Sequence, residues 1–361
     1  MSRPSLGAAL LLPMTLAAFG CVAAAPVAAA SVPAAVSMAA PAATTPTTGK
    51  PVRVVTLRDP RLLESSGLVL SPTHADLAWT VNDSGSGPVV YGVSTRTGRT
   101  RALLRLRGID FRDTEAMTAT TGSDGRGLLW VGDIGDNKRK RESVVLRLVR
   151  EPTTVGSATV TPVSLRVRYP GGAADAETLI WTPDGRLLIV TKELLSAQVL
   201  QVPPAAVRAA LNGEDTDRPV AAQRLATVTQ GLVTDGASLP DGHIVLRGYG
   251  DAVVYATPAR GQMEALEQIP LPSQPQGETL AVERGGASLL VGSEGTRQPL
   301  WRVPVPGAAG TPSSAASAKP PTSRPPVASS RRAVLWLAGG GLGLVSLAAV
   351  TGARRRGRRR R

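Results

Sequence analysis

The sequence predicts an all-β protein, a β-propeller, followed by a C-terminal transmembrane helix. Three observations in the 361 residues lead to this prediction. Short apolar runs alternate with turns rich in Gly, Pro, Asn and Asp over residues 51–303, and a pair of such runs recurs five times. A run of 21 residues without charge lies near the C-terminus. Regular short strands indicate a sandwich or a propeller, and an apolar run of this length spans a bilayer.

Residues 1–30 are typical of an export signal. Arg3 precedes an apolar run from Leu6 to Phe19, and Ala28 to Ala30 form a small-residue cleavage site before Ser31. The only cysteine, Cys21, follows "AFG", a poor match to a lipoprotein site, and we expect it to leave with the signal. Whether it is lipidated stays open. Residues 31–50 form an Ala/Pro/Thr-rich linker, and a mature chain without cysteine depends on its core for stability.

Residues 304–332 form a Pro/Ser-rich stalk that cannot build a core. The uncharged run, residues 333–353, is predicted to be a single transmembrane helix. The basic tail, residues 354–361, is expected on the cytoplasmic side and the exported body outside the cell. The sequence therefore predicts a single-pass protein of the cell membrane.

The formal charge of +14 does not indicate a nucleic-acid partner. Residues 51–303 hold all 27 acids and 28 Lys and Arg residues, a net charge of +1, and nine arginines follow Ser330. The basic excess therefore belongs to the termini, and no nucleic acid is expected to bind the body.

The body contains five repeats of a strand pair. The first strands begin at "SGLVLSP" (Ser66), "EAMTAT" (Glu115), "ETLIWTP" (Glu177), "TDGASLP" (Thr234) and "ETLAVER" (Glu278). The second strands end at "WTVNDSG", "WVGDIGDN", "IVTKE", "VLRGYGD" and "LVGSEG". A repeat at this spacing is the signature of a propeller, with one blade per unit.

Each pair is followed by a third strand and, in four units, by a fourth. The third strands are expected at 89–94, 144–149, 198–202, 253–256 and 299–303, and the fourth at 101–106, 163–168, 223–228 and 266–269. The fifth unit lacks its fourth strand, and a spare strand at 52–57 precedes the first unit, so the N-terminus completes the last blade. Five blades are predicted; a sixth stays open if a long unit hides another sheet, and a β-sandwich is a weaker alternative. One helix is expected at 204–211.

In a propeller the first strand of each blade lines the central channel. The ring is therefore predicted to contain Ser66, Glu115, Glu177, Thr234 and Glu278. A second tier two residues earlier on the same side of each strand contributes Glu64, Asp113 and Asp175. The ends of the second strands bring Asp83, Asp133, Glu193 and Glu294 to the channel mouth. The register in the fourth blade is uncertain by one residue, because Asp235 follows Thr234.

A ring of carboxylates requires compensation, because two of them ~5 Å apart repel by roughly 3 kcal/mol at an effective dielectric near 20. Calcium is abundant outside cells and takes six to eight oxygen ligands. The two histidines, His74 and His243, have no metal-ligand spacing. We therefore expect Ca²⁺ bound by the ring; the alternative is that hydration or arginine partners compensate the acids.

The motifs "SGLVLSP", "WTVNDSG", "DTEAM", "LLWVGDIGDN", "DAETL" and "LLIVTKE" resemble those of extracellular phytase-like, calcium-dependent propellers. The five-blade pattern with Ser and Glu at blade starts is similar to that of the calcium-activated nucleotidases. The resemblance covers most of residues 64–294. It implies that Ser66, Glu115, Glu177 and Glu278 are calcium ligands and that the mouth takes a phosphate-bearing substrate, while Thr234 departs from the pattern.

The stretch "DIGDNKRKR" places Lys138, Arg139, Lys140 and Arg141 on one loop. These cations are predicted to stand over the channel mouth, where they would bind phosphates. The alternative is a solvated hairpin whose charges aid solubility.

These features predict a membrane-anchored extracellular propeller that binds an unidentified ligand or partner at an acid-lined, calcium-containing mouth. One alternative is a calcium-dependent phosphoester hydrolase of the phytase or nucleotidase type. Another is a partner-binding propeller without metal. A propeller fold alone does not choose between them.

Overall fold

The computed structural model describes residues 49–216 and 218–307. The predicted signal, transmembrane helix and basic tail, and nearly all of the N-terminal linker and of the stalk, lie outside the described residues. Within the part of the chain that the structure describes, no helix is both long and apolar enough to cross a bilayer.

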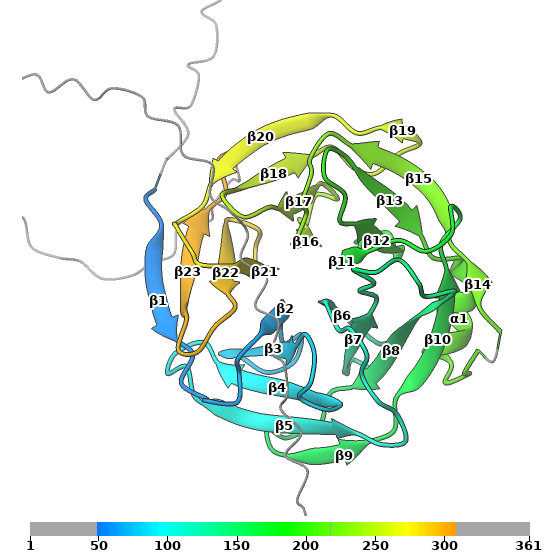
Figure 1. Ribbon diagram of the computed structural model, residues 1–361. Helices are drawn as coiled ribbons and strands as arrows, with labels where there is room; N and C mark the ends of the chain where they lie inside the picture. Colours follow the sequence, from blue (N-terminus) through cyan, green and yellow to red (C-terminus); the bar gives the residue numbers. More distant parts are fainter. Residues whose placement is uncertain (1–48, 217, 308–361) are drawn as a thin grey trace, which may run out of the picture. The chain divides into compact units, whose positions relative to one another are not determined.

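Five antiparallel sheets surround a central channel, which confirms the five-bladed propeller (Figure 1). Blade 1 contains β2 (Ser65–Leu70), β3 (Leu77–Asn82), β4 (Val89–Ser94) and β5 (Thr100–Leu106). Blade 2 contains β6 (Ala116–Thr121), β7 (Gly127–Asp133), β8 (Val144–Arg150) and β10 (Val163–Arg168). Blade 3 contains β11 (Ala176–Trp181), β12 (Leu187–Thr191), β13 (Ala197–Gln201) and β15 (Gln223–Val228).

Blade 4 contains β16 (Asp235–Ser238), β17 (Ile244–Arg247), β18 (Asp251–Tyr255) and β20 (Ala265–Pro270). Blade 5 contains β21 (Gly277–Val282), β22 (Ser288–Ser293) and β23 (Pro299–Pro304). Its fourth strand is β1 (Val52–Thr56), which pairs antiparallel with β23. The predicted closure of the ring by the N-terminal strand is therefore confirmed.

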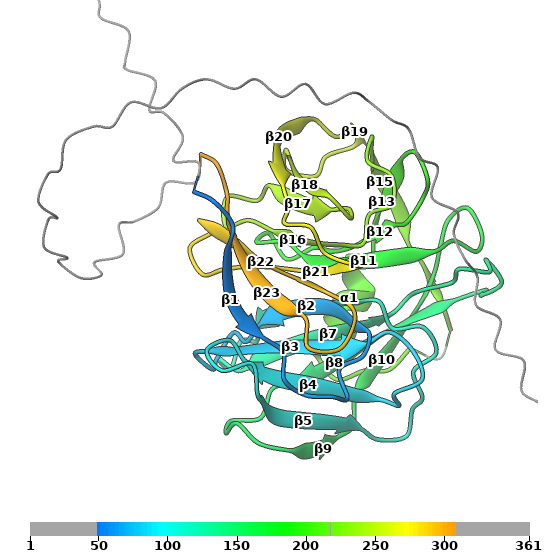
Figure 2. The same ribbon diagram turned by 60° about the vertical axis from the view of Figure 1, so that its left-hand side comes forward.

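Three short outer strands were not predicted from the sequence. They are β9 (Ala158–Val160), β14 (Val220–Ala221) and β19 (Gly261–Gln262). Each comes from the chain of one blade and pairs parallel with the outer strand of the preceding blade, β5, β10 and β15 respectively (Figure 2). Pieces of two or three residues carry no alternation of apolar and polar positions, so the pattern that located the other strands does not reveal them.

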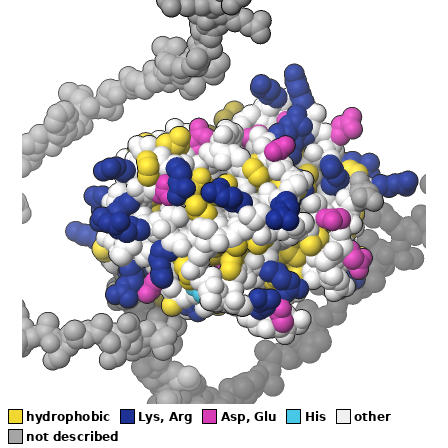
Figure 3. Space-filling model, turned by 90° about the horizontal axis from the view of Figure 1, so that it is seen from below, with side chains coloured by type: hydrophobic (Ala, Val, Ile, Leu, Met, Phe, Trp, Pro, Cys, Tyr) yellow, Lys and Arg dark blue, Asp and Glu magenta, His cyan; other side chains and the backbone are white. Residues whose placement is uncertain are grey.

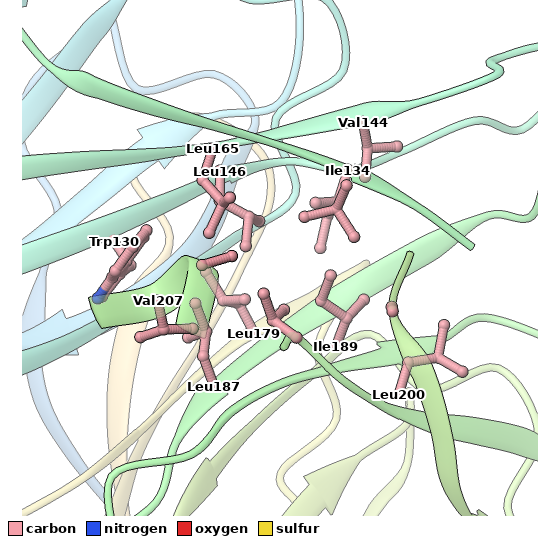
Figure 4. Packing of buried hydrophobic residues seen from close by; sticks show 14 of the residues in the cluster. Trp130, Ile134, Val144, Leu146, Leu165, Leu179, Leu187, Ile189, Leu200 and Val207 are labelled. Atoms are coloured by element: carbon pink, nitrogen blue, oxygen red, sulfur yellow. The ribbon is translucent and has the colours of Figure 1, made fainter. Parts of the chain in front are cut away.

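The hydrophobic core lies between neighbouring blades. The largest cluster joins blades 2 and 3, where Trp130, Leu146 and Leu165 face Leu179 and Ile189 (Figure 4). The predicted helix is present as α1 (Pro204–Leu211), and Val207 packs into the same cluster. Because these apolar contacts hold each blade against the next, the inner strands form a closed frame for the channel.

Successive strands run in opposite directions, so the connections after the second and fourth strands of every blade emerge at one end of the propeller. We call this end the mouth face. It consists of the loops 58–64, 83–88, 107–115, 134–143, 169–175, 192–196, 229–234, 248–250, 271–276 and 294–298. The acids at the starts of first strands and the ends of second strands lie at this end of the channel.

Candidate functional site

The five predicted ring residues lie at the innermost strands of the five blades. Ser66, Glu177 and Glu278 belong to β2, β11 and β21, while Glu115 and Thr234 immediately precede β6 and β16. All five are buried, and each innermost strand contacts the innermost strands of its two neighbours. The repeat therefore located the ring, but the ring residues do not share one role.

Ser66 and Thr234 bond neighbouring blades together. The Ser66 hydroxyl donates to the Glu115 carbonyl oxygen at 2.8 Å, and the Thr234 hydroxyl donates to the Gly277 carbonyl oxygen at 2.8 Å. In blade 4 the acid is displaced by one residue. Asp235 is fully buried, and its carboxylate accepts from the backbone N–H groups of Gly236 (2.8 Å) and Leu280 (2.6 Å). This acid ties blade 4 to blade 5 and does not take the channel position of the other blades.

Three carboxylates gather between blades 1 and 2 at the mouth face. One oxygen from each of Asp83, Asp113 and Glu115 lies within 4.8 Å of the other two. We call this group the acid cluster. Asp83 follows the end of β3, and Asp113 and Glu115 precede β6, so adjacent blades supply it. Only Glu115 belongs to the predicted ring; Asp83 and Asp113 were predicted as ligand-binding residues of the mouth and second tier.

The acid cluster has no cation of its own among the described residues. None of the ion pairs in this part of the chain involves Asp83, Asp113 or Glu115, and the Asp83 Oδ1 atom is buried without a hydrogen-bond partner. Burial, followed by the charge of Asp113, raises the pKa of Asp83 to about 7. Burial, followed by the charge of Glu177, also raises the pKa of Glu115. The arrangement favours either a shared proton or a bound cation.

Gly135 forms one wall of the acid cluster. A Cβ atom at this position would lie 2.6 Å from the Asp113 Cγ and 2.7 Å from the Glu115 Oε1. Only glycine allows the backbone to approach the two carboxylates so closely. This close approach and the unpartnered oxygen of Asp83 fit an oxygen-liganded cation, because the carboxylates are held together and one acceptor stays unused.

Between blades 3 and 5 the channel contains its own cation. The Lys192 Nζ donates to the Glu177 Oε1 at 2.5 Å and lies 5.5 Å from the centre of the Tyr249 ring. Burial disfavours the charged amine, but the carboxylates of Glu177 and Glu278 outweigh it and raise the pKa of Lys192. Sequence reasoning missed Lys192, although the motif "IVTKE" contains it, because the neighbouring Glu193 was assigned to the channel.

Glu193 forms an ion pair on the mouth face. Its carboxylate forms an ion pair with Arg139 at 2.9 Å, and this pair joins the loop 192–196 of blade 3 to the loop 134–143 of blade 2. Glu193 belongs to the mouth-face loop 192–196, but Lys192, and not Glu193, contacts the ring acid Glu177.

Asp133 and Arg141 also differ from the prediction. They form an ion pair at 2.9 Å, with side chains only 4% and 5% exposed. The Arg141 guanidinium also donates to the carbonyl oxygens of Gly135 and Asp133, so it fixes the loop 134–143 from beneath. Arg141 does not stand over the mouth, and Asp133 is not available to a ligand; Lys138, Arg139 and Lys140 are exposed.

The remaining predicted acids lie around the mouth. The Asp175 carboxylate accepts from the Asp136 backbone N–H at 2.7 Å, and the Glu294 carboxylate accepts from the Gln276 side chain at 2.9 Å. Burial, followed by the charges of Glu278 and Asp83, raises the pKa of Glu294 to about 7. Glu64 is half-buried, and its backbone carbonyl accepts from the Asp83 N–H at 2.9 Å.

Apolar side chains rim the mouth face. Of the seven exposed large hydrophobic residues in the described part of the chain, five belong to its loops: Leu63, Leu194, Leu195, Leu232 and Tyr249. We call these five the apolar rim. Leu194 and Leu195 are 73% and 82% exposed. The Leu232 N–H donates to the Glu193 carbonyl oxygen at 2.6 Å, so the loops of blades 3 and 4 that carry most of the rim are in contact. Isolated leucines in turn sequences gave no signal for this surface.

Comparison with known proteins gives no family assignment. No family model matches the chain, and no curated protein matches it. Among solved structures, regucalcin of Agrobacterium tumefaciens, described as a calcium-binding protein, is 13% identical with a TM-score of 0.43, covering 71% of this chain and 96% of its own.

Two further solved structures are at the same level of similarity. The PQQ-bound aldose sugar dehydrogenase of Streptomyces coelicolor is 11% identical, with a TM-score of 0.41 and coverage of 72% and 99%. A putative gluconolactonase is 15% identical, with a TM-score of 0.39 and coverage of 72% and 83%. Likenesses this distant assign no activity; the sheet topology itself defines the propeller.

Proposed function

We propose that this protein is a calcium-binding β-propeller that presents its mouth face to a partner outside the cell. The acid cluster is the observation that carries the proposal. Three carboxylates from two blades converge there, and none of the described residues neutralises them with a charged side chain. A divalent cation held by Asp83, Asp113 and Glu115 would offset their repulsion and give the unpartnered Asp83 Oδ1 a bonding partner.

Calcium is the ion that suits this group of ligands best. The three ligands are carboxylates, which are hard oxygen donors, and the group includes no His or Cys among the described residues. Zinc and copper prefer softer ligand sets, so they suit this group less well. Calcium tolerates irregular geometry and completes its six to eight ligands with backbone oxygens and water. Magnesium requires near-octahedral geometry and keeps more of its water, so it serves as the natural comparison.

The apolar rim supports a polypeptide partner. The rim extends over loops of blades 1, 3 and 4, a wider surface than a small molecule would cover. Exposed apolar groups around a polar centre are typical of protein interaction sites. Because Glu64, Glu278 and Glu294 surround the centre, we propose a partner segment that places a basic side chain among apolar ones.

Phosphoester hydrolysis is the second candidate, and the positions of the basic residues weigh against it. Arg141 is buried in its ion pair with Asp133, and Arg139 is bound to Glu193. Two of the four cations that were expected to hold a phosphate over the acids are thus engaged in ion pairs, while Lys138 and Lys140 are exposed. Partner binding requires no such cations.

We also propose that the body is exported and held at the cell membrane by a single span. The signal-like residues 1–30 and the uncharged residues 333–353 support this location. Protease treatment of intact cells should degrade the body and leave a C-terminal fragment in the membrane fraction. A full-length chain that resists protease until the cells are lysed would contradict this location.

Calcium titration of the full-length protein in mild detergent tests the metal proposal. After treatment with EDTA, calcium should bind saturably and raise the melting temperature, because a ligand specific to the folded state stabilises it; at 100 times the Kd the gain is about 2.7 kcal/mol. Magnesium should have a smaller effect. Asp83→Asn should abolish the response and still unfold cooperatively in EDTA.

Asp110→Asn is the matched control, because Asp110 is an exposed acid of the same mouth face outside the acid cluster. It should respond to calcium like the unaltered protein. Absence of calcium binding to the unaltered protein, or an unchanged response in Asp83→Asn, would refute the metal site.

A further inference from the structure

We infer that blade 2 carries a second binding site, a hollow that takes a phosphate or sulfate group. The hollow has a volume of about 490 Å³ and lies between the loops 107–115 and 134–143 and the outer strands of blade 2. Its cationic lining residues are Arg112, Lys140, Arg141, Arg147 and Arg166. We call it the anion hollow. It lies outside the acid cluster and does not depend on the proposed calcium site.

Arg147 is the residue that most needs an anionic partner. It lies in β8, half-buried, and one guanidinium N–H donates to the Ser164 hydroxyl at 2.5 Å. Its Nε atom is buried without a hydrogen-bond partner among the described residues, and no ion pair of that part of the chain includes it. A buried donor of a charged group that lacks an acceptor is costly, so this arginine favours a bound oxyanion.

Arg166 stands beside Arg147 on the same face of the sheet. In the pairing of β10 with β8, Ser164 lies opposite Arg147 and Arg166 lies opposite Val145. The two arginines are therefore diagonal neighbours, a separation that long side chains bridge. Without a ligand their like charges repel, and burial together with Arg166 lowers the pKa of Arg147 despite the opposing charge of Asp133.

The acids that line the hollow leave an excess of positive charge. Asp133 is already bound to Arg141 at 2.9 Å, so this pair contributes no net charge. The other lining acids are Asp110 and Glu142, against four cations: Arg112, Lys140, Arg147 and Arg166. Asp215, whose carboxylate accepts from the Ser164 N–H at 2.6 Å, also acts on Arg147 and reduces this excess, but the lining stays positive and favours an oxyanion.

One flank of the propeller is rich in cations. Figure 3 shows that Lys and Arg side chains outnumber Asp and Glu on the flank of the propeller below β5 and β9 in Figure 1. A positive surface raises the local concentration of anions and speeds their association.

The anion hollow and the acid cluster meet at the bend of residues 112–113. Arg112 lines the hollow, while the next residue, Asp113, belongs to the acid cluster. The lining of the hollow includes none of Asp83, Asp113 and Glu115, so the two sites have separate linings of opposite charge. An anion in the hollow would therefore not be a ligand of the proposed calcium ion.

Titration of the full-length protein with inorganic phosphate and with sulfate, in EDTA and at constant ionic strength set with chloride, tests the inference. Both anions should bind saturably and raise the melting temperature. Arg147→Met and Arg166→Gln should each weaken binding at least tenfold, and Arg105→Gln, an exposed arginine of β5, should leave it unchanged. Glycerol 3-phosphate, compared with inorganic phosphate, distinguishes an esterified ligand from the free ion.

No saturable effect beyond that of chloride would overturn the inference, as would unchanged binding in both Arg147→Met and Arg166→Gln. Because Arg166 is exposed, its variant keeps the test valid if Arg147→Met does not fold. Asp83→Asn should bind phosphate normally. If the unaltered protein binds phosphate but not calcium, the proposed calcium site alone is refuted; if it binds calcium but not phosphate, the anion hollow alone is refuted.

Discussion

The two sides of the channel differ in how the charge of their carboxylates is offset. Between blades 1 and 2, the acid cluster gathers three carboxylates without a described cationic side chain. On the side of blades 3 to 5, the Lys192 amine contacts Glu177 at 2.5 Å and lies close enough to Glu278 for their charges to interact. We call these the open side and the compensated side of the channel. The repeat placed similar acids on both, yet only one side received a counter-charge from the chain.

This difference shows that acids at equivalent positions of the repeat do not form the same kind of site in every blade. Each carboxylate costs folding free energy when it is buried, and a neighbour must offset that cost. On the compensated side Lys192 offsets part of that cost, although burial still raises the pKa of Glu177 to about 9 and also raises the pKa of Glu278. On the open side the cost persists until a proton or a cation binds, so this side is where binding can be regulated.

Removing the internal cation should have the largest effect. In Lys192→Met, Glu177 loses its ion-pair partner while it stays buried, and we expect the free energy of unfolding in EDTA at pH 7.5 to fall by about 3 kcal/mol. Urea denaturation measures this change. Part of the loss should be recovered at pH 5, because protonation removes the uncompensated charge.

Lys138→Met is the control for this variant, since Lys138 is an exposed lysine of the same mouth face. It should change stability by less than about 0.5 kcal/mol. Equal stability of Lys192→Met and Lys138→Met would remove the distinction between the two sides.

The open side should make stability depend on pH. The pKa of Asp83 is about 7 in the folded state and about 4 in the unfolded chain, so the folded state holds its proton more tightly. Stability is then greatest below pH 4 and falls as the pH rises toward 7. In EDTA we expect a loss of about 2 kcal/mol between pH 5 and pH 8, smaller than a fully buried group would give.

Calcium should remove this loss, and Asp83→Asn should flatten the pH profile without calcium. Urea denaturation at a series of pH values, with EDTA or calcium, provides the measurement. Stability that rises with pH in EDTA would mean that the open side is compensated in some other way.

The close approach of Gly135 to the acid cluster should affect how tightly the open side binds calcium. A methyl group in Gly135→Ala would press on the carboxylates of Asp113 and Glu115, and we expect calcium to bind about tenfold more weakly, about 1.4 kcal/mol. Gly250→Ala is the matched control, because a Cβ at this mouth-face position meets nothing within 4 Å. Calorimetric titration measures the calcium affinity of both variants. Equal affinities would contradict the proposal that Gly135 forms a wall of the acid cluster.

The sequence contained most of the fold. The five strand pairs, the outer strands and the closing strand β1 follow from alternating apolar residues and from a repeat that places each strand by analogy with the others. The short strands β9, β14 and β19 depend on contacts between blades that no local pattern encodes.

The candidate site was predictable in position but not in its pairings. The repeat brought Glu115, Glu177 and Glu278 to the inner ring as expected. Which acid meets a cation depends on the direction of single side chains, and a shift of one residue exchanged Lys192 with Glu193. The sequence also did not predict that Arg141 is buried beneath its own loop, because an arginine in a run of four cations is expected to be exposed to solvent.

The closing strand also determines how the body would carry mechanical load. The described chain leaves the propeller directly after β23, and β23 is hydrogen-bonded to β22 on one edge and to β1 on the other. A pull on the C-terminal side therefore acts on a strand clamped along both edges. A pull on the N-terminal side acts on β1, which is held along one edge only and would peel away first.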